Sequence, residues 1–150
     1  MATLTSCNKS QEMDKEKTNA KTYMEEFHSY AQPNDAVITH LDLDIDVIFD
    51  TQVISGTATY DVVNNGATAS ILDAKYLEII AVKADGKETR FQLGDMDESL
   101  GQPLRIEIKE STNKIAITYK TTAQTEALQW LTAQQTADKT NPFLFTQGQA

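Results

Sequence analysis

Apolar and polar residues alternate along two successive stretches of the chain, and this period of two constrains the fold more than any other feature. In Leu41–Phe49 the odd-numbered residues are large and apolar, and Asp42, Asp44 and Asp46 lie between them. Ile54–Val62 repeats the pattern after a polar turn. Because successive side chains of a strand point to opposite faces, each stretch predicts a strand with one buried and one solvated face. The short turn predicts antiparallel pairing.

Further strands follow at close spacing, and no long helical pattern interrupts them. The expected strands are Ser70–Asp73, Leu77–Lys83, Leu104–Ile108, Ile115–Tyr119 and Pro142–Thr146. Asp85-Gly86 predicts a tight hairpin, because both turn positions of its favoured type require positive φ. Thr121–Asn141 is expected to be irregular, with Trp130 as its hydrophobic anchor. The sequence therefore predicts an all-β fold, an antiparallel sandwich over residues 37–150.

The first 36 residues have a different composition. Asn8–Lys21 is almost free of large apolar side chains and predicts a solvated, disordered tether. Residues 22–31 carry aromatic residues at helical spacing, which indicates a short helix. Leu4-Thr5-Ser6-Cys7 matches the lipobox of bacterial lipoproteins, although the hydrophobic part of a signal peptide does not precede it. The match predicts that Cys7 is lipidated and that the protein lies in the periplasm or at the outer membrane. If the match is accidental, the expected location is the cytoplasm.

Composition excludes several classes of function. Thirteen basic and 22 acidic residues give a net charge of −9, which disfavours binding to nucleic acid. The same charge disfavours a basic membrane-binding surface, so the expected membrane contact is a lipid on Cys7. One cysteine cannot form an internal disulfide, and His28 and His40 fit no metal motif. The sequence contains no HExxH, P-loop or G-x-S-x-G motif, so it holds no recognisable catalytic machinery. Asp42, Asp44 and Asp46 are interpreted as a solvated face rather than a calcium site.

Gln147 and Gln149 are separated by one residue at the end of the last expected strand. On an extended chain two such side chains point the same way, so both amide oxygens can accept hydrogen bonds from one ligand. Gly148 between them allows close approach of a substrate or backbone. Such pairs also occur on ordinary exposed strands. The chain stops soon after this strand, at Ala150, which indicates a fragment of a longer protein.

The segment ALQWLTAQQTADKTNPFLFTQGQA, residues 127–150, resembles the corresponding stretch of leukotriene A4 hydrolase and its bacterial relatives, which are zinc aminopeptidases. Ile54–Val62, Ile71–Ile79 and Leu93–Ile108 follow the same family pattern in order and spacing. The resemblance covers about Val37 to Ala150. It implies a saddle-shaped N-terminal β-domain, truncated here at its C-terminus, that packs on a catalytic domain carrying HExxH.

The resemblance also implies roles for single residues. Gln149 would hold the α-amino group of a peptide substrate, with Gln147, Gly148 and Ala150 alongside. Gly148 stands where relatives often carry Cys. Zinc would be bound in the parent enzyme by ligands that follow Ala150, in the protein's own catalytic domain. The chain of 150 residues is therefore expected to bind no zinc and cleave nothing alone.

The function indicated is that of the N-terminal segment of a zinc metallo-aminopeptidase. A free-standing lipoprotein β-sandwich that binds peptide or carbohydrate on the Trp130 segment is the main alternative. A purely structural or adhesive surface domain is a third.

Overall fold

The computed structural model describes residues 28–147, and this part of the chain is built from β-strands with one 3₁₀ turn and no α-helix. The all-β prediction is confirmed. No helix in this part is long and apolar enough to cross a membrane. The strands are β1 Ala36–Ile48, β2 Val53–Asn64, β3 Ala69–Ala74, β4 Leu77–Ala84, β5 Lys87–Glu88, β6 Phe91–Leu93, β7 Gln102–Glu107, β8 Lys114–Thr121, β9 Leu128–Leu131 and β10 Phe143–Thr146.

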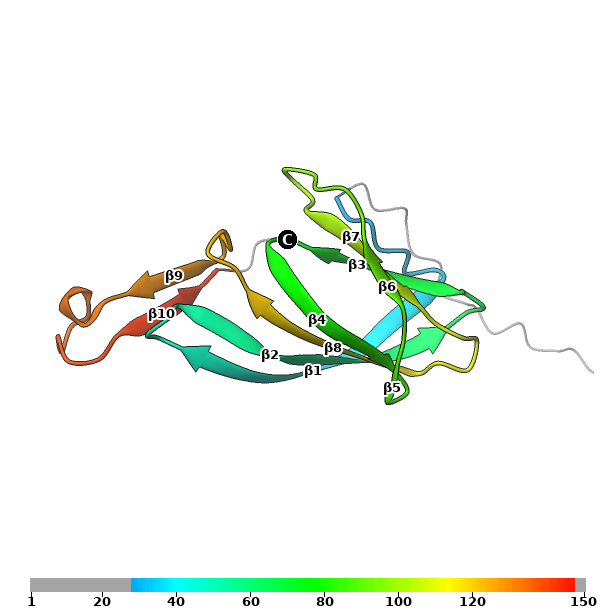
Figure 1. Cartoon of the computed structure of the whole chain (residues 1–150), viewed down its shortest axis with the longest axis horizontal. Coiled ribbons are helices and arrows are strands. Elements are labelled where there is room, and N and C mark those ends of the chain that lie inside the picture. Colours follow the sequence, from blue (N-terminus) through cyan, green and yellow to red (C-terminus); the bar gives the residue numbers. More distant parts are fainter. Residues whose placement is uncertain (1–27, 148–150) are drawn as a thin grey trace, which may run out of the picture.

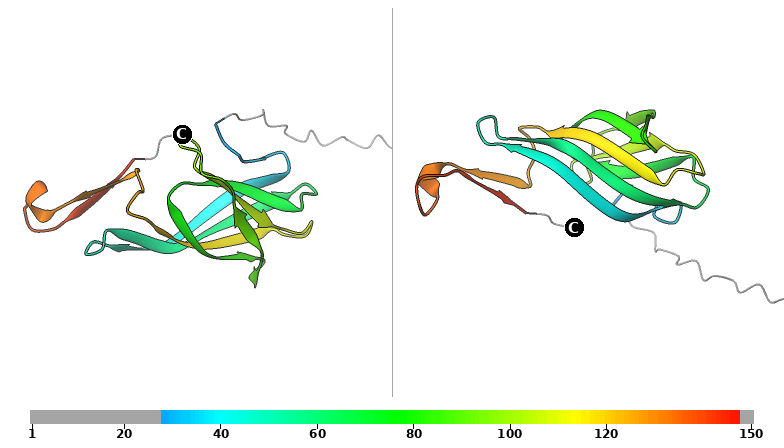
Figure 2. Two further views of the ribbon diagram at one scale, coloured as in Figure 1. Left: turned by 45° about the horizontal axis from the view of Figure 1, so that its top comes forward. Right: turned by 90° about the horizontal axis from the view of Figure 1, so that it is seen from below.

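The strands form three antiparallel sheets (Figure 1). The large sheet has the order β1-β2-β8-β4-β5, the second β3-β7-β6, and β9 pairs with β10. The three-stranded sheet lies across one face of the curved large sheet, and the β9–β10 hairpin extends from one end of the molecule (Figure 2). The result is a sandwich that covers only part of its larger layer.

The hydrophobic core lies between the large sheet and the three-stranded sheet. Ile106 of β7 is fully buried, and Leu104 of the same strand is 2% exposed. Across the interface, Val82 of β4 and Ile115 of β8 are exposed by 2% and 1%. Alternating inward residues of facing sheets are what produce such a core. These four side chains mark the best-covered part of the large sheet.

The prediction that β1 has one buried face is wrong. Its apolar residues are substantially exposed, with Leu43 at 56% and Ile45 at 41%. The physical reason is the layout of the layers: β1 is an edge strand, and the core residues of the large sheet come mainly from β2, β4 and β8. Alternation correctly predicted the strand and its pairing with β2, but it carries no information on whether another layer covers the apolar face.

The tight turn predicted at Asp85-Gly86 is confirmed by its backbone conformation. Asp85 and Gly86, between β4 and β5, both have positive φ, at 50° and 78°. The main-chain N–H of Asp85 donates to the carbonyl of Lys114, 2.9 Å away, which ties this hairpin to the start of β8. The dipeptide therefore marks a reversal of the chain, as expected.

The segment expected to be irregular contains β9 and a single 3₁₀ turn at Ala133–Gln135. β9 pairs with β10 in register, Trp130 opposite Leu144. The Trp130 ring meets Phe49 edge to face, with ring centroids 5.6 Å apart. Trp130 thus fastens the hairpin to the turn between β1 and β2. The anchor role was predicted, and the strand was not.

The expected helix over residues 22–31 lies mostly outside the described residues, and its described end, residues 28–31, is not helical. Instead the Ser29 hydroxyl donates to Asp73 of β3 (2.6 Å), and the Tyr30 N–H donates to the other oxygen of the same carboxylate (2.9 Å). Hydrogen bonds to a charged acceptor are among the stronger ones. They fix the segment that leads into β1 on the three-stranded sheet.

Candidate functional site

A polar cavity of about 480 Å³ lies where three loops meet the end of the described chain. Its lining residues come from the β3–β4 turn, the loop before β7, the segment before β9, and the residue that follows β10. They are Lys75, Tyr76, Ser99, Thr125, Glu126, Ala127 and Gln147. Gln147 is the one residue of the predicted amine-binding set that the structure describes, and it lies in this cavity.

The wall at the β3–β4 turn is held in an uncommon conformation. Tyr76 has a φ of 56°, a left-handed geometry that side chains other than glycine seldom adopt. Its carbonyl oxygen accepts hydrogen bonds from the N–H and hydroxyl of Thr122 (3.2 and 2.9 Å) and from the hydroxyl of Thr125 (3.1 Å). These bonds hold the turn against the segment before β9, so two walls of the cavity form one unit.

The loop before β7, which carries Ser99, forms another wall of the cavity. The Asp97 carboxylate accepts the N–H groups of Ser99 and Leu100, each at 2.8 Å. The hydrogen bond from Leu100, followed in size by the one from Ser99, holds the pKa of the Asp97 carboxyl below its usual value. The positive charge of Lys75 lowers this pKa further. Gly101 closes the loop with a φ of +79° and packs so tightly that a Cβ would lie 2.6 Å from the Ala74 carbonyl oxygen.

The lowered pKa of Asp97 predicts a loop that depends on pH. A carboxyl whose pKa is lower in the folded state stabilises the fold above its unfolded pKa, and this contribution disappears as pH falls through the folded value. We expect the amides of Ser99 and Leu100 to lose protection from hydrogen exchange below about pH 4. Asp97→Asn should remove most of this pH dependence, whereas Asp95→Asn should leave it intact. Equal pH dependence in the wild type and Asp97→Asn would contradict the assignment.

The cavity contains one ion pair. Lys75 Nζ lies 3.1 Å from Glu126 Oε2 and 5.5 Å from the centroid of the Tyr76 ring. The Lys75 side chain is 30% exposed, and that of Glu126 is 67% exposed. An exposed pair of this kind adds little stability. Its chemical consequence is that an accessible carboxylate stands in the same cavity as the Gln147 amide.

Gln147 continues the β9–β10 ladder by one step, because its N–H donates to the Ala127 carbonyl at 3.0 Å. The side chain is exposed. By strand alternation it lies on the same side of the ribbon as Phe145 and Phe143, which are 46% and 53% exposed. Gly148, Gln149 and Ala150 lie outside the described residues, as does Cys7.

A second, apolar cavity of about 440 Å³ opens between the two larger sheets and the β9–β10 hairpin. Leu43 and Ile45 of β1 line it, together with Leu128 of β9 and Thr146 of β10. The cavity therefore brings the end of β10 next to the exposed apolar face of the edge strand.

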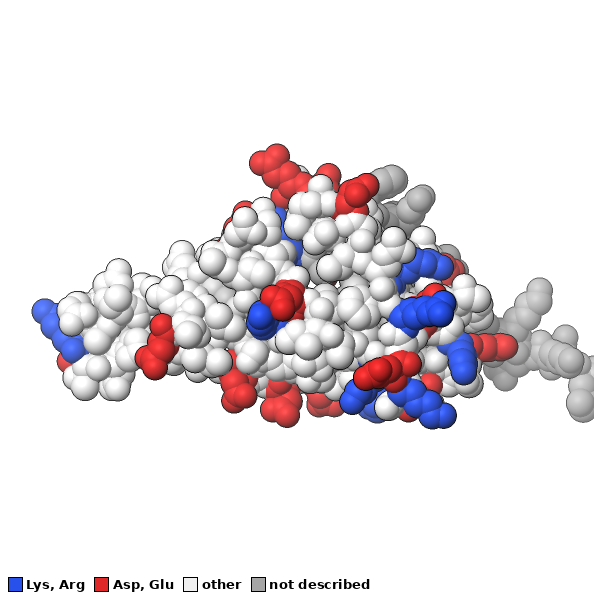
Figure 3. All heavy atoms as spheres, in the orientation of Figure 1, with Lys and Arg blue, Asp and Glu red and all other residues white. Residues whose placement is uncertain are grey.

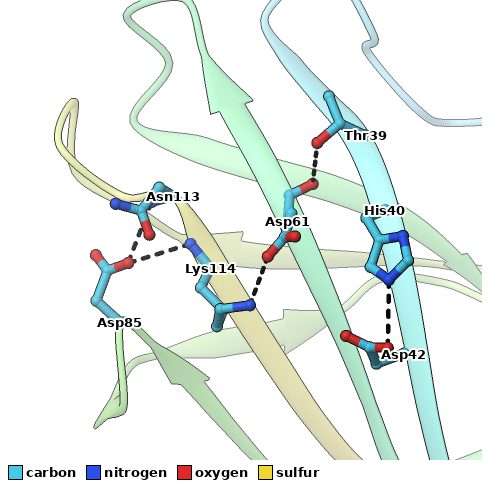
Figure 4. A network of polar contacts seen from close by, with 7 residues as sticks. All are labelled: Thr39, His40, Asp42, Asp61, Asp85, Asn113 and Lys114. Atoms are coloured by element: carbon cyan, nitrogen blue, oxygen red, sulfur yellow. Dashed lines mark hydrogen bonds and ion pairs between the residues drawn. The ribbon is translucent and has the colours of Figure 1, made fainter.

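The outer face of the large sheet is polar, and its ion pairs are exposed (Figure 4). Lys114 pairs with Asp61, and His40 Nε2 lies 3.2 Å from Asp42 Oδ1. The Lys114 ammonium holds the pKa of the Asp61 carboxyl below its usual value. Within residues 28–147 no group of three or more histidine, cysteine, aspartate or glutamate side chains is placed to hold a metal ion. Asp42, Asp44 and Asp46 are exposed, as the solvated-face interpretation expects.

Comparison with known proteins identifies the family to which the chain belongs. No family model matches the chain. Leucine aminopeptidase 2 of Ajellomyces capsulatus is 38% identical over 120 residues, which cover 75% of this chain and 19% of that protein. Leucine aminopeptidase 2 of Yarrowia lipolytica is 38% identical over 103 residues, covering 66% of this chain and 16% of that protein.

Solved structures of similar fold indicate the same family of enzymes. Yeast leukotriene A4 hydrolase in complex with bestatin matches with a TM-score of 0.77 and 29% identity, over 85% of this chain and 21% of that one. Native leukotriene A4 hydrolase from Saccharomyces cerevisiae matches with a TM-score of 0.72 and 30% identity, over 79% and 20%. The fold is that of the N-terminal β-domain of this class of enzyme.

The chain is homologous to the N-terminal part of leucine aminopeptidase 2 and leukotriene A4 hydrolase, members of a zinc aminopeptidase family. This confirms the family that residues 127–150 predicted. The chain spans about a fifth of the length of these relatives. The relatives named here are fungal, so they give no support to the expected bacterial origin.

The cavity also contains residues that the sequence did not single out. Lys75 and Tyr76 are neighbours, but Glu126 follows Lys75 by 51 positions, and none of the three belongs to a motif, so only the fold brings them together with Gln147. The left-handed Tyr76 is a particular case, because the usual signal for positive φ is Gly, Asn or Asp. No local pattern could have found it.

Proposed function

We propose that the chain is the N-terminal segment of a zinc metallo-aminopeptidase that removes N-terminal residues from peptides. In this proposal it walls one side of the substrate cleft and binds the peptide α-amine through Gln149, with Gln147, Gly148 and Ala150 alongside. The observation that carries the proposal is homology to the N-terminal parts of aminopeptidases, joined to the exposed position of Gln147 in the polar cavity.

The chemistry of the cavity suits an ammonium group. An amide oxygen accepts hydrogen bonds from –NH₃⁺, and bonds to a charged group contribute about 1.5–3 kcal/mol. The exposed Glu126 carboxylate also lines the cavity, where Lys75 Nζ, 3.1 Å away, offsets its negative charge, so the amide oxygens are the main acceptors. Holding the N-terminus of a peptide also fixes where its first peptide bond lies, which favours cleavage there over cleavage further along the chain.

The described residues do not fit a zinc site, because they offer no suitable group of ligands. In the proposal the zinc ligands belong to a catalytic domain that follows Ala150 in the longer protein. The contribution of the present chain is to bind and orient the substrate.

The proposal predicts opposite results for two forms of the protein. The 150-residue chain should not hydrolyse an aminoacyl-arylamide. The longer protein encoded by the same gene should hydrolyse it and lose this activity after treatment with a chelator, with recovery on adding zinc. Chelator-sensitive hydrolysis by the 150-residue chain, or an inactive longer protein, would contradict the proposal.

We also propose that Cys7 is lipidated and anchors a bacterial enzyme in the cell envelope, with residues 8–27 as the spacer. The support is the Leu4-Thr5-Ser6-Cys7 sequence and the polar segment after it. Membrane fractionation and mass spectrometry of the native protein test this. A lipid on Cys7 that disappears in Cys7→Ser supports it, and recovery of an unmodified wild type from the cytoplasm contradicts it.

A further inference from the structure

The β9–β10 hairpin, which leads to the glutamines assigned above to the amine, extends from one end of the molecule (Figure 1). On the face seen in Figure 3, the charged side chains of this hairpin lie at its tip, and its remaining visible surface is uncharged. Its contacts with the rest of the molecule include Trp130 on Phe49 and the hydrogen bonds that tie the segment before β9 to the β3–β4 turn. The second contact lies at the cavity that contains Gln147, so it bears directly on the candidate site.

One carbonyl oxygen is the centre of this second contact. Tyr76 O accepts hydrogen bonds from the hydroxyls of Thr122 and Thr125, at 2.9 and 3.1 Å. The Thr122 N–H is shared between this oxygen and the Thr125 hydroxyl, at 3.2 Å from each. The Thr125 N–H in turn donates to the Thr122 carbonyl at 3.1 Å. Because the three residues are bonded to one another, the segment before β9 is fixed to the turn in one orientation.

The turn that presents this oxygen has little freedom of its own. Tyr76 has a φ of 56°, a left-handed conformation that persists in a residue other than glycine only where the surrounding structure enforces it. Gly101 packs against the start of the turn and leaves no room for a Cβ beside the Ala74 carbonyl oxygen. Residues in such conformations are concentrated at functional sites. The turn is therefore a rigid support for the segment bonded to it.

The bonds to Tyr76 reach Gln147 through a short stretch of chain. Thr125 precedes Ala127 by two residues, and the Ala127 carbonyl accepts the Gln147 N–H at 3.0 Å. Gln149 follows Gln147 by two residues. The orientation of the Tyr76 carbonyl therefore determines where the segment that carries both glutamines begins.

We propose that Thr122, Thr125 and the left-handed Tyr76 are positioning residues for binding of the peptide α-amine. They hold the end of the strand at Gln147 and thereby set the place of Gln149 in the substrate cleft. This inference rests on the proposed function, which assigns the amine to the glutamines. A displacement of about 1 Å in a substrate-positioning group can lower the rate about 100-fold, so contacts outside the cleft can control recognition within it.

Thr122→Val in the longer protein tests the proposal, because Thr122 is not among the residues that line the cavity and valine removes only its hydroxyl donor. We expect the preference for a peptide with a free N-terminus over its N-acetylated form, measured as a ratio of kcat/KM values, to fall about 5-fold or more. The Gln147 amide should exchange its hydrogen about 10-fold faster or more. Thr122→Ser, which restores the hydroxyl, should recover both values.

Thr89→Val is the matched control for this variant. The Thr89 hydroxyl also donates to a backbone carbonyl, that of Glu107 at 2.7 Å, but neither residue lines the polar cavity. Both measurements should stay at their wild-type values in this control. A wild-type value of either measurement in Thr122→Val, or a loss that Thr122→Ser fails to restore, would overturn the proposal.

The backbone conformation of Tyr76 is tested by two substitutions that both remove its ring. Asparagine adopts positive φ more readily than most residues, whereas a β-branched valine seldom does. Tyr76→Asn should therefore keep more of the amide protection and more of the preference for a free amine than Tyr76→Val. Equal losses in the two variants would assign the effect to the ring and contradict the role of the backbone.

The same assay separates this inference from the proposed function. A loss of preference in Gln149→Ala, together with wild-type preference in Thr122→Val, would leave the proposed function standing and overturn the positioning role. Undiminished preference in Gln149→Ala would refute the proposed function and, with it, the link to amine binding. Exchange of the Gln147 amide would still show whether Thr122 fixes the end of the strand.

Discussion

Replacing Gly56 by valine is expected to break the pairing of β1 with β2 and to lower the free energy of unfolding by about 3 kcal/mol or more. Gly56 faces Ile45 across the two strands. A Cβ at position 56 would overlap the Asp44 carbonyl oxygen and come within 2.7 Å of the Ile45 Cα. Both obstacles are backbone atoms, so no change of rotamer relieves the clash, and β1 itself must move.

The matched control is Ser55→Val, one residue earlier on the opposite face of β2. Valine has a high strand propensity and Ser55 is only half-buried, so this change should be close to neutral. Urea unfolding of both variants measures the effect. If Gly56→Val retained wild-type stability while β1 amides stayed protected, the close approach of the two strands would be wrong.

Replacing Gln149 by alanine in the longer protein is expected to lower kcat/KM for peptides by about 10- to 100-fold. The estimate follows from the loss of a hydrogen bond to a charged group, which contributes about 1.5–3 kcal/mol. In the proposed function the site binds the amine both before and during the reaction, so KM should rise, and misplacement of the first peptide bond should also lower kcat. Steady-state kinetics on a series of short peptides measures both.

Gln92→Ala is the matched control for this variant, because Gln92 is an exposed glutamine on β6, away from the residues that line the cavity. It should leave both constants unchanged. Glu126→Gln should produce a smaller loss than Gln149→Ala, since its carboxylate is largely solvated and already paired with Lys75. Wild-type kinetics in Gln149→Ala would remove the assigned role of the glutamine pair.

Much of the fold follows from the sequence because it is encoded locally. The period-two alternation of Leu41–Phe49 and Ile54–Val62 predicts the β1–β2 hairpin, and Asp85-Gly86 predicts the turn after β4. Antiparallel neighbours joined by short turns leave few alternative arrangements. The all-β class, the pairing of β1 with β2 and the turn after β4 could therefore be predicted, whereas the position of β8 between β2 and β4 could not.

The exposure of β1 could not be predicted, because it depends on how far the second layer extends over the large sheet. β9 was missed for a related reason. Leu128–Leu131 is short and surrounded by polar residues, and its strand conformation depends on pairing with β10, twelve or more residues later in the chain. Pairing of this kind leaves no local pattern.

The candidate site was predicted only in part. Gln147 was found from its spacing to Gln149 and from the family resemblance, and the structure places it in a polar cavity. Lys75 and Glu126 were not found, since an ion pair between residues 51 positions apart is visible only after folding. The turn at Tyr76 brings the lysine to the glutamate.

In the proposed function, this segment recognises the free α-amine of the peptide for the peptidase to which it belongs. The most direct measurement compares kcat/KM for a short peptide with a free N-terminus and for its N-acetylated form, in the longer wild-type protein and in Gln149→Ala. We predict strong discrimination in the wild type and a loss of about 10-fold or more of that discrimination in the variant. Undiminished discrimination in Gln149→Ala would contradict the claim.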